Sequence, residues 1–180
     1  MASYVATITQ AAHHAVTSLL SAAQVKPGST IATSVEVKEN APDQTFKLEG
    51  ISGKNIIVGV PGAFTGTCSA QIPGYIKAYE QFKEKGVKDI YVVAVNDVFV
   101  LKAWKDQLAP GGTPIRFIAD DKGAFVGSLG LLFDATPLLG GPRSKRFVLV
   151  TEGDEITHVA VEAVPSELTI TAAEKILPLL

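Results

Sequence analysis

The chain has 180 residues, a formal net charge of −2 and an apolar fraction of 47%. This composition excludes a disordered chain and predicts no nucleic-acid partner and no membrane partner, because it carries neither a basic surface nor a block of like charge. No apolar run approaches the roughly 18 residues of a membrane-spanning helix. A single cysteine excludes an intrachain disulfide and a multi-cysteine metal site, and it favours a reducing compartment.

The first 26 residues differ in composition from the rest. They contain no acidic residue, and apolar residues from Val5 to Ala23 recur on one face of a helix that Lys26-Pro27-Gly28 ends. The stretch resembles a mitochondrial presequence but lacks arginine. We therefore predict an N-terminal helical extension over residues 1–26 and one domain over residues 27–180. We expect a cytoplasmic protein, with the mitochondrion as the alternative.

Strands and helices are expected to alternate through the domain. The continuous apolar runs Asn55–Val60 and Asp89–Val95 are typical of buried central strands. Two β-rich runs around Gly153-Asp154 predict a hairpin. The complete set of predicted strands is Val35–Val37, Thr45–Leu48, Asn55–Val60, Asp89–Val95, Ile115–Ala119, Phe147–Thr151 and Ile156–Glu162.

Four helices are expected, three of them between these strands and one after the last strand. The first carries Ile72, Ile76, Tyr79 and Phe82 at helical spacing and ends at Gly86. The others are a helix from an Asp97 cap to about Leu108, a short helix from Asp121 or Lys122 through Phe125, and a last helix with a capping box from Thr171 to Glu174. This order predicts an α/β fold of thioredoxin-like architecture, with a central mixed β-sheet and helices on both faces.

The lone cysteine, Cys68, lies in a Gly/Pro-rich loop between an apolar strand and a helix. Ligands bind at this edge of open α/β sheets. Free amides and the helix dipole at such a position favour the thiolate, which is the nucleophilic form of a cysteine. Thr65 can hydrogen-bond the thiolate or a bound oxygen, and Pro61 stiffens the entry to the loop. A small buried cysteine is the alternative, but its neighbours are Gly, Thr and Ser.

The run from Pro61 to Ser69, followed by Ile72-Pro73-Gly74-Tyr75, resembles the active-site segment of peroxiredoxins, and most closely the atypical fifth subfamily, called type II in plants. The resemblance covers residues 27–180. Three further segments match it in order: Val95–Val100 with Trp104, Ala119–Phe125, and Arg143–Phe147.

The resemblance implies a thiol peroxidase that reduces hydrogen peroxide and organic hydroperoxides without a cofactor or metal. It implies that Cys68 is the peroxidatic cysteine, which becomes a sulfenic acid. It also implies that Arg146 holds the thiolate and the leaving oxygen, that Thr65 bonds the peroxide and that Pro61 shields the pocket. We also expect Thr67 to bind substrate, and Arg143 is a weaker candidate for supporting the pocket. A homodimer is expected on the same ground.

The chain departs from the family pattern at two places. Gly66 stands where relatives usually have proline, and Leu168-Thr169-Ile170 carries no resolving cysteine. Because no second cysteine exists, we predict a one-cysteine mechanism in which glutathione, glutaredoxin or thioredoxin supplies the external thiol.

Two other functions fit the sequence less well than the peroxidase. A cysteine hydrolase or transferase needs a histidine base beside Cys68, and no histidine lies within the matched segments. A redox-inactive binding module would not need Pro61, Thr65, Cys68 and Arg146 together. The absence of a Cys-x-x-Cys pair excludes a thioredoxin-type disulfide reductase.

Overall fold

A computed structural model describes residues 23–180, so nearly all of the predicted N-terminal extension lies outside the described residues. The sheet has seven strands in the order β2-β1-β5-β4-β3-β8-β9. The three central strands, β3 (Lys54–Gly59), β4 (Val87–Ala94) and β5 (Arg116–Ala119), are parallel. The flanking strands pair in antiparallel fashion: β1 (Glu36–Glu39), β2 (Thr45–Lys47), β8 (Phe147–Glu152) and β9 (Glu155–Val161).

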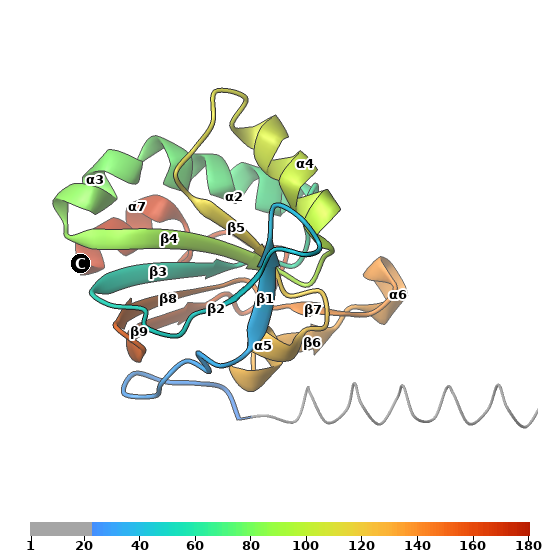
Figure 1. The fold of residues 1–180 in the computed structure, drawn as a ribbon, viewed down its shortest axis with the longest axis horizontal. Coiled ribbons are helices and arrows are strands. Elements are labelled where there is room, and N and C mark those ends of the chain that lie inside the picture. Colours follow the sequence, from blue (N-terminus) through green and yellow to red (C-terminus); the bar gives the residue numbers. More distant parts are fainter. Residues whose placement is uncertain (1–22) are drawn as a thin grey trace, which may run out of the picture.

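Helices cover both faces of this sheet (Figure 1). On one face lie α2 (Gly66–Lys77), α3 (Tyr79–Glu84), α4 (Val98–Leu108) and α7 (Ala173–Ile176), followed by a 3₁₀ turn at Leu177–Leu179. On the other face lies α5 (Ala124–Ser128). A separate two-stranded sheet, β6 (Leu132–Asp134) and β7 (Pro142–Ser144), is connected through α6 (Thr136–Leu139). The predicted thioredoxin-like α/β fold is confirmed.

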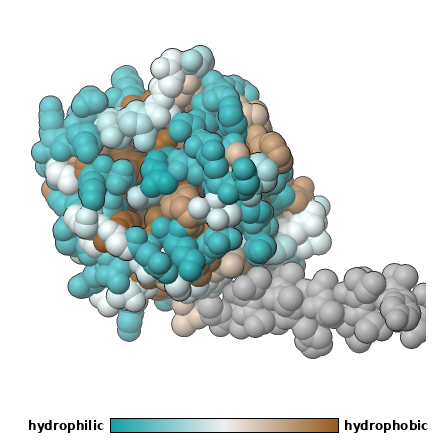
Figure 2. All heavy atoms as spheres, in the orientation of Figure 1, coloured by the Kyte–Doolittle hydropathy of each residue, from teal (hydrophilic) through white to brown (hydrophobic). Residues whose placement is uncertain are grey.

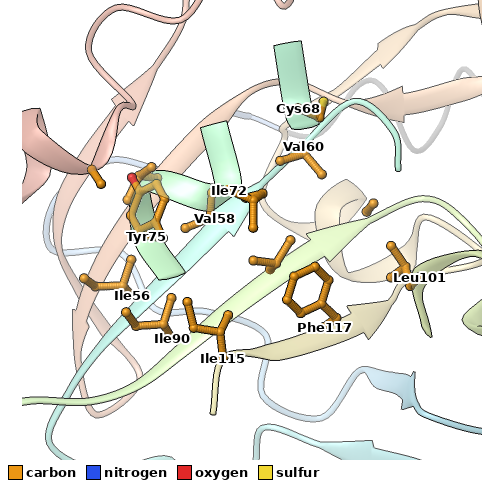
Figure 3. Packing of buried hydrophobic residues seen from close by; sticks show 14 of the residues in the cluster. Ile56, Val58, Val60, Cys68, Ile72, Tyr75, Ile90, Leu101, Ile115 and Phe117 are labelled. Carbon is orange, nitrogen blue, oxygen red and sulfur yellow. The ribbon is translucent and has the colours of Figure 1, made fainter. Parts of the chain in front are cut away.

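The core has two parts because successive side chains of a strand point to opposite faces of the sheet. Ile56, Val58 and Val60 pack with α2 and α4, whereas Ile57 packs with α5 on the other side. Figure 3 shows the first three in a row along β3, with Cys68 lying beyond Val60 at the end of the row. The cysteine therefore sits where the apolar core meets the carboxyl end of the sheet.

The predicted first helix is interrupted at Ala78, which separates α2 from α3. The apolar spacing continues on one face across the break, so periodicity alone could not reveal it. The predicted capping box is wrong, because Ala172 is the N-cap of α7. The hydroxyl of Thr171 instead bonds Glu162 and Gln71. The short helix α5 begins later than predicted, after Gly123 in the left-handed conformation.

The face drawn in Figure 2 is mostly hydrophilic, with apolar side chains in scattered patches. Within residues 23–180, every helix is too short or too polar to cross a bilayer.

Candidate active site

Cys68 lies in the first turn of α2, just after β3 and the Gly/Pro-rich loop. Thr65 is the N-cap, with φ −69° and ψ 149°, and its carbonyl oxygen accepts a hydrogen bond from the amide of Ser69 at 2.9 Å. The first amides of a helix have no partner within the helix, so they point positive partial charge at this region. The thiol itself is fully buried.

Arg146 lies beside this thiol, although the side chains come from distant parts of the sequence. Its Nη2 donates to Cys68 Sγ at 3.3 Å, and its side chain is buried, with 1% exposure. The contact follows from strand pairing, since Phe147 at the start of β8 is opposite Gly59 at the end of β3. A guanidinium stays protonated at any ordinary pH. It therefore brings a permanent positive charge to the sulfur.

A pocket of about 340 Å³ opens beside Arg146. Four of the predicted site residues line it: Pro61, Thr65, Thr67 and Arg146. The rest of the wall is largely apolar, and its members are Gly66, Phe133, Leu138, Leu139, Val164, Pro165 and Ser166. The structure thus gathers a cation, two hydroxyl groups and an apolar wall in one pocket, and Arg146 connects this pocket to the buried thiol.

The two threonine hydroxyls donate their hydrogens to backbone carbonyls. Thr65 Oγ1 donates to the oxygen of Gly62 at 3.0 Å, and Thr67 Oγ1 donates to the oxygen of Ser166 at 3.0 Å. Each hydroxyl oxygen keeps lone pairs with which it can accept a hydrogen bond from a ligand. Neither is hydrogen-bonded to Cys68 here, although the sequence suggested that Thr65 could bond the thiolate.

The loop before α2 holds one residue in an unusual backbone conformation. Phe64 has a φ of 63°, in the left-handed region that bulky residues seldom adopt, and 48% of it is exposed. The neighbouring amide of Ala63 donates to Asn96 Oδ1 at 3.0 Å. This bond ties the loop to the carboxyl end of β4. Strain of this kind persists only where the surrounding structure imposes it.

Sequence reasoning missed Gln71 next to the site, and it missed the hydrogen bond between Trp104 and Ser69. Gln71 Oε1 accepts from Arg146 Nη1 at 2.6 Å, and Trp104 Nε1 donates to Ser69 Oγ at 3.1 Å. Gln71 follows Cys68 by three positions, which places both on one face of a helix. That spacing was the available signal.

Arg143, the weaker candidate, lies apart from the thiol contacts. Its Nη1 donates to the oxygen of Val95 at 2.7 Å and its Nη2 to the oxygen of Leu139 at 2.9 Å. Because Leu139 lines the pocket, Arg143 supports the pocket wall rather than the thiol.

Residues 23–180 give little support to a cysteine hydrolase or transferase, or to a metal site. His158, the histidine within residues 23–180, is exposed on the edge strand β9, whereas Cys68 is buried. His13 and His14 lie outside the described residues. No group of three His, Cys, Asp or Glu side chains in residues 23–180 is arranged to hold a metal ion.

Comparison with known proteins identifies the family. The Redoxin family profile matches residues 26–177. The chain is 46% identical over 154 residues to peroxisomal membrane associated protein 20 of Schizosaccharomyces pombe, covering 85% of this chain and 97% of that protein. It is 42% identical over 137 residues to rice peroxiredoxin-2C, covering 74% of this chain and 83% of the relative.

Solved structures agree with these relatives. Reduced Prx3 of Vibrio vulnificus in complex with hydrogen peroxide superimposes with a TM-score of 0.79 and 35% identity, covering 87% of this chain and all of that one. Peroxiredoxin 5 of Alvinella pompejana gives a TM-score of 0.77 and 32% identity, with 86% and 96% covered. With one cysteine in its sequence, the chain belongs to the redoxin family as a one-cysteine, type II peroxiredoxin, a thiol-dependent peroxidase of antioxidant function.

Proposed function

We propose that the protein reduces hydrogen peroxide and organic hydroperoxides at Cys68, and that an external thiol regenerates this cysteine. The observation that carries the proposal is the 3.3 Å contact between Arg146 Nη2 and Cys68 Sγ. A guanidinium so close to a buried sulfur stabilises the negative charge that the sulfur carries when it attacks a peroxide.

In the first step the Cys68 thiolate attacks the nearer oxygen of the hydroperoxide. The sulfur electron pair forms the S–O bond while the O–O bond breaks, and its electron pair leaves with the distal oxygen. That oxygen takes up a proton and departs as water or an alcohol, and Cys68 becomes a sulfenic acid. Arg146 stabilises the charge that builds on the leaving oxygen, since it also lines the pocket.

Three residues of the pocket are assigned to substrate binding. The free lone pairs of the Thr65 hydroxyl accept the O–H of the peroxide, and Thr67 adds a second acceptor at the pocket edge. Pro61 shields the site from water. The apolar wall accommodates the organic group of a larger hydroperoxide, which supports organic hydroperoxides as substrates.

In the second step an external thiol attacks the sulfenic sulfur, releases water and forms a mixed disulfide with Cys68. A second thiol then releases Cys68 and leaves as a disulfide, so that two external thiols are oxidised for each hydroperoxide reduced. The chain has no other cysteine to do this. Glutathione, glutaredoxin or thioredoxin is the proposed reductant.

The test is steady-state peroxide consumption with each of these reductants in turn, using hydrogen peroxide and an alkyl hydroperoxide. We expect turnover with at least one reductant, and none for Cys68→Ser. Non-reducing electrophoresis after one equivalent of peroxide should show monomer. A predominant covalent dimer that dithiothreitol reduces would contradict external resolution.

We also propose a homodimer that forms beside the pocket. Large apolar side chains are exposed in this region: Leu138 is 89% exposed and Val164 45%, and both line the pocket. Phe64 precedes the active-site helix, and Phe99, which is 65% exposed, lies in the first turn of α4, just after Asn96, whose side chain bonds the active-site loop at Ala63. Exposed apolar side chains that gather near one site are typical of an interface.

Light scattering of the wild-type protein and Phe99→Glu tests the dimer. Leu179→Glu, at an exposed residue of the C-terminal turn, is the matched control. We expect a dimer for wild type and the control, and a larger monomer fraction for Phe99→Glu. A wild-type protein that is monomeric at micromolar concentration would contradict the proposal.

The proposed compartment is the cytoplasm, with the mitochondrion as the alternative. The lone reduced thiol supports a reducing compartment. The printed names of relatives differ, with one peroxisomal membrane associated and another, peroxiredoxin-2F of Arabidopsis thaliana, mitochondrial. Fractionation of cells that express the native chain decides between the cytoplasm and the mitochondrion.

A further inference from the structure

Gln71 connects the arginine of the site to a distant loop. Its side chain is buried, with 2% exposure, and its Oε1 accepts from Arg146 Nη1 at 2.6 Å. Its Nε2 donates to both the carbonyl oxygen of Thr171 at 3.0 Å and the Thr171 hydroxyl at 3.1 Å. Every polar atom of this amide therefore has a partner.

The partners also fix which way the amide faces. The carbonyl oxygen of Thr171 can only accept, and Arg146 can only donate. The NH₂ group must face Thr171, and the oxygen must face Arg146. If the amide were reversed, its oxygen would face the carbonyl oxygen of Thr171, and its NH₂ group would face the guanidinium of Arg146. An acceptor would then meet an acceptor, and a donor would meet a donor. The guanidinium thus meets an acceptor that cannot turn away.

Thr171 is itself held from two sides. Glu162 accepts from the Thr171 amide at 2.9 Å and from its hydroxyl at 2.8 Å, and Glu162 also accepts from the amide and hydroxyl of Thr169. The hydroxyl of Tyr75 donates to the carbonyl oxygen of Thr171 at 2.6 Å. Burial, with the charges of Glu174 and Glu162, raises the pKa of Tyr75, so its hydroxyl keeps this proton.

The chain of contacts leaves the charge of Arg146 unpaired by any carboxylate. Its acceptors are Gln71 Oε1, the carbonyl oxygen of Pro165 at 3.1 Å from Nε, and Cys68 Sγ. None of the ion pairs found within residues 23–180 includes Arg146. A neutral amide therefore fixes the guanidinium while the positive charge stays directed at the sulfur.

We propose that Gln71 is the positioning residue of Arg146, with Thr171 as its anchor. Gln71 makes no hydrogen bond to the thiol and does not line the pocket, and it acts through the guanidinium. The inference deepens the proposed function and rests on it, because the guanidinium that Gln71 positions is the one assigned to peroxide reduction. Small displacements of a group that stabilises developing charge are costly, on the order of 100-fold in rate for about 1 Å.

Two substitutions separate positioning from packing. Gln71→Met keeps an apolar side chain of similar length but offers Arg146 no strong acceptor, whereas Gln71→Glu keeps an oxygen for Nη1 and loses the donors to Thr171. Positioning predicts that Gln71→Met slows oxidation by hydrogen peroxide on the order of 10-fold to 100-fold, and that Gln71→Glu is faster than Gln71→Met. Packing alone predicts the reverse order, because a buried carboxylate that faces the carbonyl oxygen of Thr171 disturbs the core more than an apolar methionine does.

The rate is measured by stopped-flow fluorescence of Trp104, which is the chain's single tryptophan and is bonded to Ser69 next to the thiol. Gln81→Met, at an exposed glutamine of α3, is the matched control and should react as wild type. In an Arg146→Met background, Gln71→Met should not lower the rate further, because Gln71 acts through the guanidinium that this background has already removed. Equal losses in both backgrounds would overturn the proposal.

Nitrogen NMR of the reduced protein, without peroxide, tests independently whether Gln71 positions Arg146. A guanidinium held at all three nitrogens should give separate, slowly exchanging signals for Arg146 in wild type, and they should merge in Gln71→Met. Unchanged signals in Gln71→Met would overturn the positioning role. A wild-type protein that reacts with peroxide no faster than free cysteine would instead refute the proposed function, and the NMR comparison would still decide the role of Gln71.

Discussion

Cys68 and Arg146 are in hydrogen-bond contact, with 3.3 Å between Sγ and Nη2, although 78 positions separate them in the sequence. The pairing of β3 with β8 explains this contact, because Arg146 directly precedes Phe147, which lies opposite Gly59, and the loop that leads to Cys68 begins at the end of β3. The thiol and its cation are therefore held by the most buried part of the sheet.

Replacing Arg146 with lysine should remove most of the activity. A lysine amine cannot reach Gln71 Oε1, the oxygen of Pro165 and the thiol sulfur in one plane, as the guanidinium does. We expect the rate with peroxide to fall on the order of 100-fold to 1,000-fold. Arg116→Lys, on the half-buried arginine paired with Glu39, is the control and should keep the wild-type rate. A wild-type rate for Arg146→Lys would show that charge alone is sufficient.

Adding a methyl group at Gly59 should destabilise the fold. A Cβ there would overlap the ring of Phe147, the residue directly after Arg146. Overpacking of a buried site typically costs about 1–3 kcal/mol. Urea unfolding should show such a loss for Gly59→Ala and almost none for Gly111→Ala, where a Cβ meets nothing within 4 Å. Equal stabilities of the two variants would contradict the close strand packing.

Proline at position 66, where relatives usually have it, should stabilise this chain. Gly66 is the first residue of α2, a position that suits proline, and Thr65 already has the extended backbone that a following proline requires. We expect Gly66→Pro to raise the free energy of unfolding by about 0.4–1 kcal/mol with the peroxide rate retained. Gly123→Pro should lower stability, because Gly123 has a φ of 67°. A destabilised Gly66→Pro would mean that this loop is less regular than described.

Glu162→Gln should lower the free energy of unfolding more at neutral pH than at acid pH. Burial alone would raise the pKa of Glu162, but the hydrogen bonds from Thr169 and Thr171 outweigh it and lower the pKa. A lowered pKa in the folded state stabilises the fold above the ordinary glutamate range, and this contribution disappears as the pH falls through the lowered value.

We expect a loss of about 1–3 kcal/mol at pH 7 for Glu162→Gln, because an amide cannot accept all four hydrogen bonds. Urea unfolding at neutral pH and near pH 3 measures the change. The exposed Glu155 of β9 provides the control, Glu155→Gln. A loss for Glu162→Gln that does not shrink in acid would rule out the charged carboxylate as its source.

The central strands could be predicted from sequence because buried parallel strands are continuous apolar runs, as in Asn55–Val60 for β3. The position of Cys68 in the first turn of a helix followed from the loop before it. The stretch from β6 to β7 was not predicted. Its strands have three residues each and pair only with one another, so they leave no periodic pattern.

The contacts of the site were harder to predict than its members. Resemblance to a family could propose Arg146, but the bonds of Gln71 to Arg146 and Thr171 join residues 75 and 100 positions apart. A single sequence contains no signal for such long-range side-chain contacts. The capping box predicted at Thr171 was wrong for the same reason. The local pattern assigned the Thr171 hydroxyl to the helix N-terminus, but this hydroxyl bonds the distant side chains of Gln71 and Glu162.

The central claim is that Cys68 is a peroxide-reducing thiolate held by Arg146. The most direct measurement is the second-order rate at which stoichiometric hydrogen peroxide oxidises the reduced protein, followed by Trp104 fluorescence and by mass spectrometry of Cys68. The account predicts a rate orders of magnitude above that of free cysteine at the same pH, with one oxygen atom added at Cys68. A rate equal to that of free cysteine would contradict it.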